Sequence, residues 1–181
     1  MTNLFQQLLT LDTGKTISKQ QMVANIKRLI KSSDYVITEL NDEKPWGAYF
    51  RFGHGDSDKF INEFFSNLND LRHQLGENGG LSLKLLLVEP NQGVSWQYHE
   101  RRAEIWSFIN DGFFARSIND VEGEPRLARS GDIVQFAPSE RHRLIGHKKS
   151  YTIVAEIWQH TDLNKLSDED DIVRLADYYA R

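Results

Sequence analysis

The chain contains no cysteine, and this absence excludes several kinds of chemistry. Without thiols there can be no disulfide framework, no thiolate nucleophile and no thiolate metal site.

A surplus of basic residues is also absent. The 22 Lys and Arg residues are outnumbered by 26 Asp and Glu residues, which gives a formal net charge of −4. Nucleic acids and anionic membranes attract proteins through positive charge, so we expect neither as a partner. No apolar run approaches the length needed to span a bilayer, and the first residues lack the pattern of a signal peptide. We therefore expect a soluble cytoplasmic protein.

The first third of the chain predicts helices. With 181 residues, of which 39% are hydrophobic, the chain suits one domain with a modest appendage. Ser18 is a suitable N-cap, and apolar residues follow it at helical spacing on one stripe, namely Met22, Val23, Ile26, Leu29 and Ile30. We predict a helical arm over residues 1–34 and a further helix over 57–75.

From about residue 35, short apolar runs separated by turn residues replace the helical pattern. Their spacing is typical of an all-β sandwich or barrel, and the Asn110-Asp111-Gly112 step predicts a tight hairpin. We therefore predict a mainly β fold, a single antiparallel barrel of the jelly-roll type over residues 35–181. The acidic run at 167–171 is interpreted as the solvated start of a short C-terminal helix.

Four polar side chains in the strand region have the character of metal ligands. In "SWQYHERRAEIW", residues 95–106, the alternation of an extended segment places Gln97 and His99 on one face. Glu104 follows in the same stretch, and His142 comes after the strand-like "GDIVQF". Two imidazoles, one carboxylate and one amide oxygen suit a divalent ion such as zinc, manganese, iron or nickel.

The same residues resemble a known family. The spacing Q-x-H-x4-E, a later G-(x)6-P and a late histidine are similar to the two motifs of the cupin superfamily, whose small β-barrel holds a metal in its mouth. "KPWGAY", "SWQYHERRAEIW", "RHRL" and "SDEDDIVRLADYYAR" resemble the C-terminal isomerase domain of type II mannose-6-phosphate isomerase and mannose-1-phosphate guanylyltransferase fusion proteins, over residues 44–181. No glycine-rich nucleotide-binding signature accompanies them, so nucleotidyl transfer is not expected.

The resemblance implies a cupin, a double-stranded β-helix, in which four residues bind a divalent metal: Gln97, His99, Glu104 and His142. Zinc is the first choice of metal, with manganese, iron, nickel or cobalt as alternatives. The implied activity is that of a sugar-phosphate isomerase, which interconverts an aldose and a ketose through an enediol. A non-catalytic sugar-binding or regulatory cupin, an epimerase and a dioxygenase remain alternatives, and cupins commonly form homodimers.

Other polar residues on the predicted strands could complete the site. Lys84 and Glu156 are assigned to acid–base catalysis, although the sequence does not choose between them and Gln135, which we also assign to substrate binding. A guanidinium suits a phosphate, so Arg102 and Arg143 are further substrate-binding candidates. Arg102 is preferred to Arg101 because it shares the strand parity of Glu104.

Aromatic residues and the other histidines receive the simpler interpretation. Tryptophans at 46, 106 and 158 could stack on a sugar ring, but we expect them in the core. The remaining histidines lack ligand-like spacing and are interpreted as structural or solvated: His54, His73, His147 and His160.

Overall fold

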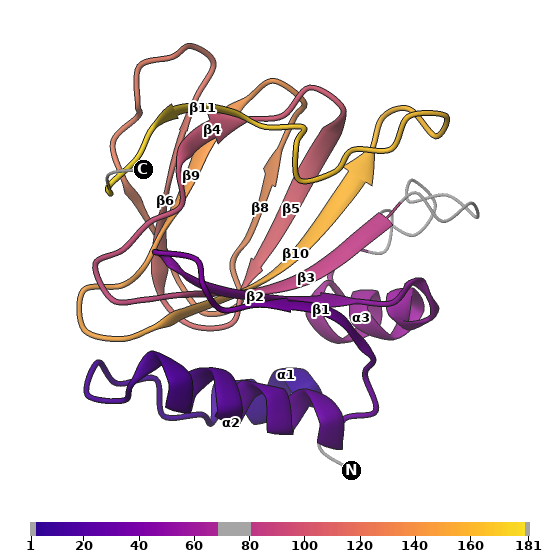
Figure 1. Cartoon of the computed structure of the whole chain (residues 1–181), viewed down its shortest axis with the longest axis vertical. Helices are drawn as coiled ribbons and strands as arrows, with labels where there is room; N and C mark the ends of the chain where they lie inside the picture. Colours follow the sequence, from indigo (N-terminus) through magenta and orange to yellow (C-terminus); the bar gives the residue numbers. More distant parts are fainter. Residues whose placement is uncertain (1–2, 69–80, 180–181) are drawn as a thin grey trace.

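The computed structural model describes residues 3–68 and 81–179, and within them the chain is mainly β (Figure 1). Two antiparallel sheets face each other, which confirms the predicted fold class. The larger sheet contains, in spatial order, β1 (Ile37–Asn41), β2 (Gly47–Phe52), β3 (Leu81–Val88), β10 (Thr152–His160), β5 (Arg102–Phe108) and β8 (Ile133–Phe136). The smaller sheet contains β11 (Val173–Ala176), β4 (Trp96–Tyr98), β9 (Arg141–Ile145), β6 (Gly112–Ser117) and β7 (Arg126–Ala128).

Three α-helices lie in the described part of the chain, against the outer face of the larger sheet (Figure 1). They are α1 (Leu4–Leu9), α2 (Lys19–Ser32) and α3 (Ser57–Phe64), and a short 3-10 turn (His54–Asp56) precedes α3. The side chain of Ser18 accepts a hydrogen bond from the Gln21 amide and so caps α2 as predicted. Residues 69–75 of the predicted second helix, with His73, lie outside the described residues. None of the described helices is long and apolar enough to cross a membrane.

The larger sheet has two faces of different character. Alternate residues of β3, Leu83, Leu85 and Leu87, enter a core that they share with the helices. The opposite face meets the smaller sheet, where apolar side chains such as Phe108 and Leu144 fill one end of the interior. The other end holds polar side chains and a cavity, and this is where the candidate site lies.

Two sequence-based predictions about local structure are wrong. The C-terminal amphipathic stretch forms β11, which pairs with β4, because a free strand edge was available there and tertiary pairing outweighed the helical pattern. The Asn110-Asp111-Gly112 step is not a hairpin, since β5 and β6 belong to different sheets. The Asn110 side chain instead accepts from the Ile153 amide (2.8 Å), which fixes the corner between the sheets.

Gly47 explains part of the "KPWGAY" motif. Its φ is +149°, and a Cβ built there would lie 1.8 Å from the Leu87 carbonyl oxygen. A side chain therefore cannot occupy this position while β2 pairs with β3. The close approach places the preceding turn, with Lys44 and Trp46, at the wall of the cavity.

Candidate active site

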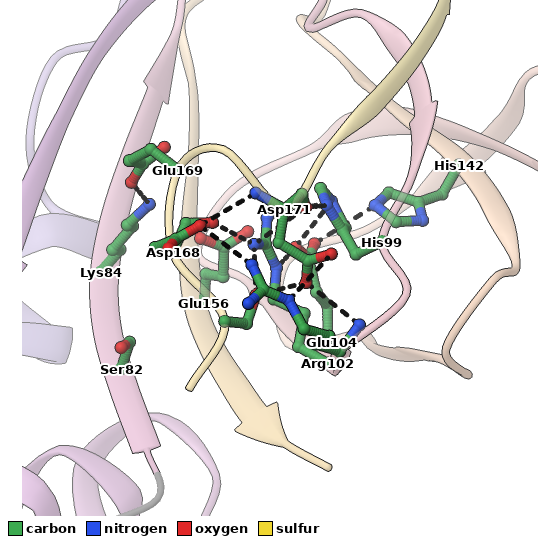
Figure 2. Close-up of polar contacts among 12 residues, drawn as sticks. Ser82, Lys84, His99, Arg102, Glu104, His142, Glu156, Asp168, Glu169 and Asp171 are labelled. Carbon is green, nitrogen blue, oxygen red and sulfur yellow. Dashed lines mark hydrogen bonds and ion pairs between the residues drawn. The ribbon is translucent and has the colours of Figure 1, made fainter. Parts of the chain in front are cut away.

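A buried cluster of two histidines and one glutamate forms at the polar end of the interior (Figure 2). His99 follows β4, Glu104 lies on β5 and His142 on β9, so three strands from both sheets position them. One ligand atom from each lies within 4.8 Å of the others. Glu104 Oε1 is 3.1 Å from His99 Nε2, and Glu104 Oε2 is 3.3 Å from His142 Nε2. The structure thus brings together three of the four predicted ligands.

Backbone carbonyl oxygens fix which nitrogen of each imidazole carries the proton. His99 Nδ1 is 2.5 Å from the Asp171 carbonyl oxygen, and His142 Nδ1 is 2.9 Å from that of Glu140. Because a carbonyl only accepts, both Nδ1 atoms donate, and both Nε2 atoms keep a lone pair. His142 Nε2 is buried without a hydrogen-bond partner among the described residues.

This arrangement fits a cation. Two nitrogen lone pairs and one carboxylate face each other in a buried space, and although Arg102 contacts Glu104 and His99, His142 Nε2 has no donor among the described residues. Burial would raise the pKa of Glu104, but its interactions with His99, Arg102 and His142 outweigh this effect and hold that pKa well below its usual range. An ionised carboxylate with two neutral imidazoles is a donor set that zinc and similar ions prefer, although the set does not identify the metal.

Arg102 already supplies one positive charge to the cluster. Its Nε donates to Glu104 Oε1 (2.8 Å), and one terminal nitrogen is 3.1 Å from His99 Nε2. The other terminal nitrogen donates to Ser167 Oγ (2.8 Å) and the Asp168 carbonyl oxygen (2.9 Å). The guanidinium is therefore engaged by protein groups, which differs from the phosphate contact predicted for it.

Of the other predicted site residues, Gln97 lies beside the cluster, whereas Gln135 and Arg143 point away from it. Gln97 pairs with His142 across β4 and β9 and lines the cavity. Gln135 is exposed, because its neighbours Val134 and Phe136 point inward and leave it on the opposite side of β8. Arg143 alternates with His142, so its side chain leaves the cluster and donates to the Ala176 carbonyl oxygen (2.8 Å). Substrate-binding roles for Gln135 and Arg143 do not fit these positions.

The cavity beside the cluster has a volume of about 410 Å³, which suits a small molecule. Lys84 and Glu156 are register partners on β3 and β10, and both line it. Trp46, Trp106 and Trp158 line it too, so the tryptophans expected in the core also form a wall that a sugar ring could contact.

The pKa values of Glu156 and Lys84 are shifted from their ordinary values. Burial, with the nearby charge of Glu104, raises the pKa of Glu156 to about 8, against the opposing effect of Lys84. Glu156 Oε1 also accepts from the Trp106 indole nitrogen (3.0 Å). Burial lowers the pKa of Lys84, although the negative charges of Glu156 and Glu169 oppose this. Acid–base groups shifted in opposite directions within one cavity are typical of catalytic sites.

The acidic run at 167–171, which we call the C-terminal strap, is not the solvated helix start predicted from the sequence. Ser167 and Asp171 are buried, and Asp171 accepts from the Glu100 and Arg101 amides (both 3.1 Å). Glu169 accepts from Lys84 Nζ (2.5 Å), as Figure 2 shows. The strap therefore holds Lys84, Arg102 and His99 in place. No local sequence signal identified it, because these contacts join residues 65 or more positions apart.

Comparison with known proteins supports the resemblance drawn from the motifs. The chain is 26% identical over 145 residues to a mannose-1-phosphate guanylyltransferase from Salmonella montevideo, a match that covers 80% of this chain and 24% of that protein. The chain thus spans about a quarter of the curated relative. No protein-family model matches the chain.

Solved structures with a similar fold include cupins. A cupin 2 conserved barrel domain protein from Salinispora arenicola is 19% identical with a TM-score of 0.40, over 46% of this chain and 66% of that one. A cupin protein from Bacteroides fragilis is 18% identical with a TM-score of 0.40, over 51% and 75%. At such scores the fold assignment rests on the strand order and register above. The chain is accordingly a mainly β protein of two antiparallel sheets that resembles the cupins and, in sequence, part of a mannose-1-phosphate guanylyltransferase.

Proposed function

We propose that the protein is a metal-dependent sugar-phosphate isomerase that interconverts an aldose phosphate and a ketose phosphate. The observation that carries this proposal is the placement of Glu156, a buried carboxyl with a pKa of about 8, in a cavity that Glu104 of the His–Glu–His cluster also lines. The similarity to a mannose-1-phosphate guanylyltransferase favours a sugar phosphate as the ligand.

Glu156 is the proposed base. In its carboxylate form it takes the proton from C2 of the aldose and returns it to C1 of the enediol, while a hydroxyl proton leaves O2 and one reaches O1. Substrate and product therefore have the same composition. A carboxylate whose conjugate acid has a pKa near 8 is a stronger base than an exposed one, and Lys84 keeps that pKa from rising further.

The described residues around the cluster would hold the metal and orient the sugar. His99, Glu104 and His142 would bind the metal, with Gln97 as the fourth ligand that the resemblance implies. When bound, a divalent ion such as zinc would act as a Lewis acid on the sugar carbonyl and its neighbouring hydroxyl. The hydrogen bonds from His99 to Asp171 and from His142 to Glu140 keep both imidazoles turned toward Glu104.

Metal content and turnover test the proposal together. Protein purified without chelator should contain about one divalent ion per chain, and coupled assays on hexose, pentose and heptose phosphates should find one that it isomerises. His142→Ala should lose both properties, whereas His147→Ala, which changes a histidine outside the cluster, should keep both. Failure of the wild-type protein to isomerise any sugar phosphate would refute the proposal.

One observation favours a second candidate, a sugar-binding cupin without catalytic metal. Arg102 approaches His99 Nε2 to 3.1 Å and must move away before that nitrogen can bind an ion. If Arg102 keeps this position, it supplies the positive charge itself and the cavity serves only for binding. The metal analysis distinguishes the two candidates. A homodimer and a cytoplasmic location stay predictions.

A further inference from the structure

Four cationic side chains line the cavity: Lys44, Lys84, Arg102 and Arg174. Two of them are neutralised within the protein, since Lys84 pairs with Glu169 (2.5 Å) and Arg102 with Glu104 (2.8 Å). Within residues 3–68 and 81–179, neither Lys44 nor Arg174 forms an ion pair. Two positive charges of the wall are therefore uncompensated.

The two unpaired cations reach the cavity from different sheets. Lys44 lies in the turn between β1 and β2 and is half-buried. The turn is held in place because its carbonyl oxygen accepts from Lys19 Nζ (2.8 Å) and the Gly47 amide (3.1 Å). Arg174 lies on β11 opposite Gln97 and is exposed. Exposure leaves its guanidinium free to reorient toward a ligand.

We propose that Lys44 and Arg174 form the phosphate subsite of this cavity. The inference rests on the proposed function, because it names where a sugar phosphate would place its charged end. A phosphate monoester carries about −1.5 to −2 charge at neutral pH, so two uncompensated cations match it. A guanidinium can bind two phosphate oxygens at once, and an ammonium adds a third contact.

Arg102 and Lys84 are poorer candidates for the phosphate contact. Every nitrogen of the Arg102 guanidinium already contacts a protein group, and binding phosphate would break its pair with Glu104. Lys84 would likewise have to leave Glu169. Phosphate at Lys44 and Arg174 leaves both pairs intact. Trp46 and Tyr49 line the same cavity, and aromatic rings suit the apolar face of a sugar.

Binding calorimetry tests the subsite without requiring turnover. The probes are hexitol 6-phosphates and the corresponding unphosphorylated hexitols, which have no carbonyl to isomerise. We compare wild type with Lys44→Ala, Arg174→Ala, the double variant and Arg102→Ala, in the presence and absence of added zinc. Lys148→Ala and Arg129→Ala are matched controls, because both residues are exposed and neither lines the cavity.

Wild type should bind the phosphorylated hexitol more tightly than its unphosphorylated counterpart. Each cavity variant should weaken the phosphorylated probe at least about tenfold, while the unphosphorylated probe changes less than about twofold. The controls should behave as wild type does. Higher salt should reduce the preference for the phosphorylated probe, as expected for an ionic contact near the surface.

The outcomes separate this inference from the proposed function. If wild type prefers the phosphorylated probe but the two cavity variants bind it unchanged, the subsite is wrong and the isomerase proposal stands. A selective loss in Arg102→Ala alone would return the role to that residue. If wild type shows no preference for the phosphorylated probe, both the phosphate subsite and the proposed sugar-phosphate substrate are wrong. Selective binding without turnover on any sugar phosphate would keep the subsite and reject the isomerase.

Discussion

Lys84 and Leu85 are neighbours on β3, but they belong to faces of the larger sheet that differ in almost every physical respect. Leu85 is fully buried under the helices in an apolar core, and its burial contributes about 1.5–3 kcal/mol. Lys84 is almost as buried on the other face, where it contacts Glu169 and the Trp158 ring. Burial of its charge opposes folding and lowers its pKa.

The comparison shows that equal burial has different consequences on the two faces. The helical face stabilises the fold through apolar contacts that need no ligand. The cavity face holds buried charged and titratable groups, including Glu104, His99 and Glu156, whose environments shift their pKa values. Substitutions on the helical face should therefore change stability alone, whereas those on the cavity face should change the chemistry and the dependence of stability on metal and pH.

The largest expected effect is the loss of activity on changing Glu156 to glutamine. The amide keeps the size of the carboxyl group but cannot accept the substrate proton, so we expect kcat to fall about 10²- to 10⁴-fold. In wild type, kcat/KM should rise with pH toward about 8 as the carboxylate forms. Glu124→Gln, at an exposed site, is the control and should keep wild-type kinetics. A Glu156→Gln enzyme with normal turnover would remove this residue from the mechanism.

On the helical face, Leu85→Ala should lower the free energy of unfolding by about 2–5 kcal/mol, because it leaves a cavity in the core. Lys84→Met, one residue away, should change it by about 1 kcal/mol or less, since an apolar chain of similar length replaces a buried ammonium. Glu169, whose side chain is 46% exposed, can regain water after losing its partner. Urea denaturation of both variants gives the comparison, and similar losses would contradict the proposed difference between the faces.

Much of this difference was predictable from residue alternation. The ligand types in "SWQYHERRAEIW", with His142 after the next strand-like run, indicated the cluster that the structure brings together. The same alternation places Gln135 and Arg143 away from the cluster. Gln135 stands between the inward-pointing Val134 and Phe136, and Arg143 follows His142 directly, so neither could share the inner face.

Other features depend on tertiary structure and had no local signal. The Asn110-Asp111-Gly112 step has hairpin chemistry, but the chain passes there from one sheet to the other, and only the pairing of whole strands decides this. The composition of the C-terminal strap does not distinguish a solvated segment from one that packs over the cavity. Its contacts with Lys84 and Arg102 arise because β11 returns to the edge of the smaller sheet.

The stability contributed by a bound metal should depend on the residues of the cavity face and not on those of the helical face. An ion that binds the folded state at about 100 times its Kd adds about 2.7 kcal/mol to stability. A chelator should therefore lower the unfolding free energy of wild type by about this amount, and zinc should restore it. His142→Ala should not respond to either treatment, whereas Leu85→Ala should respond as wild type does, from a lower starting stability. A wild-type protein indifferent to chelator and zinc would contradict the metal site.

The smallest effect is the dependence of stability on pH that Glu156 should produce between pH 6.5 and 8. Its pKa rises from an ordinary 4.5 to about 8 on folding, so the folded state holds the proton more tightly. The resulting stabilisation is complete below pH 4.5 and is lost as the pH rises through about 8, with a slope of at most about 1.4 kcal/mol per pH unit. His99 and His160 have lowered pKa values and act in the opposite direction, but only below their ordinary pKa of 6.5.

The measurement that isolates Glu156 is therefore the difference in unfolding free energy between wild type and Glu156→Gln from pH 6.5 to 8. Wild type should lose stability relative to the variant as the pH rises, and the Glu124→Gln control should follow wild type. A difference that stays constant with pH would show that Glu156 titrates in its ordinary range, and this would contradict its assignment as the base.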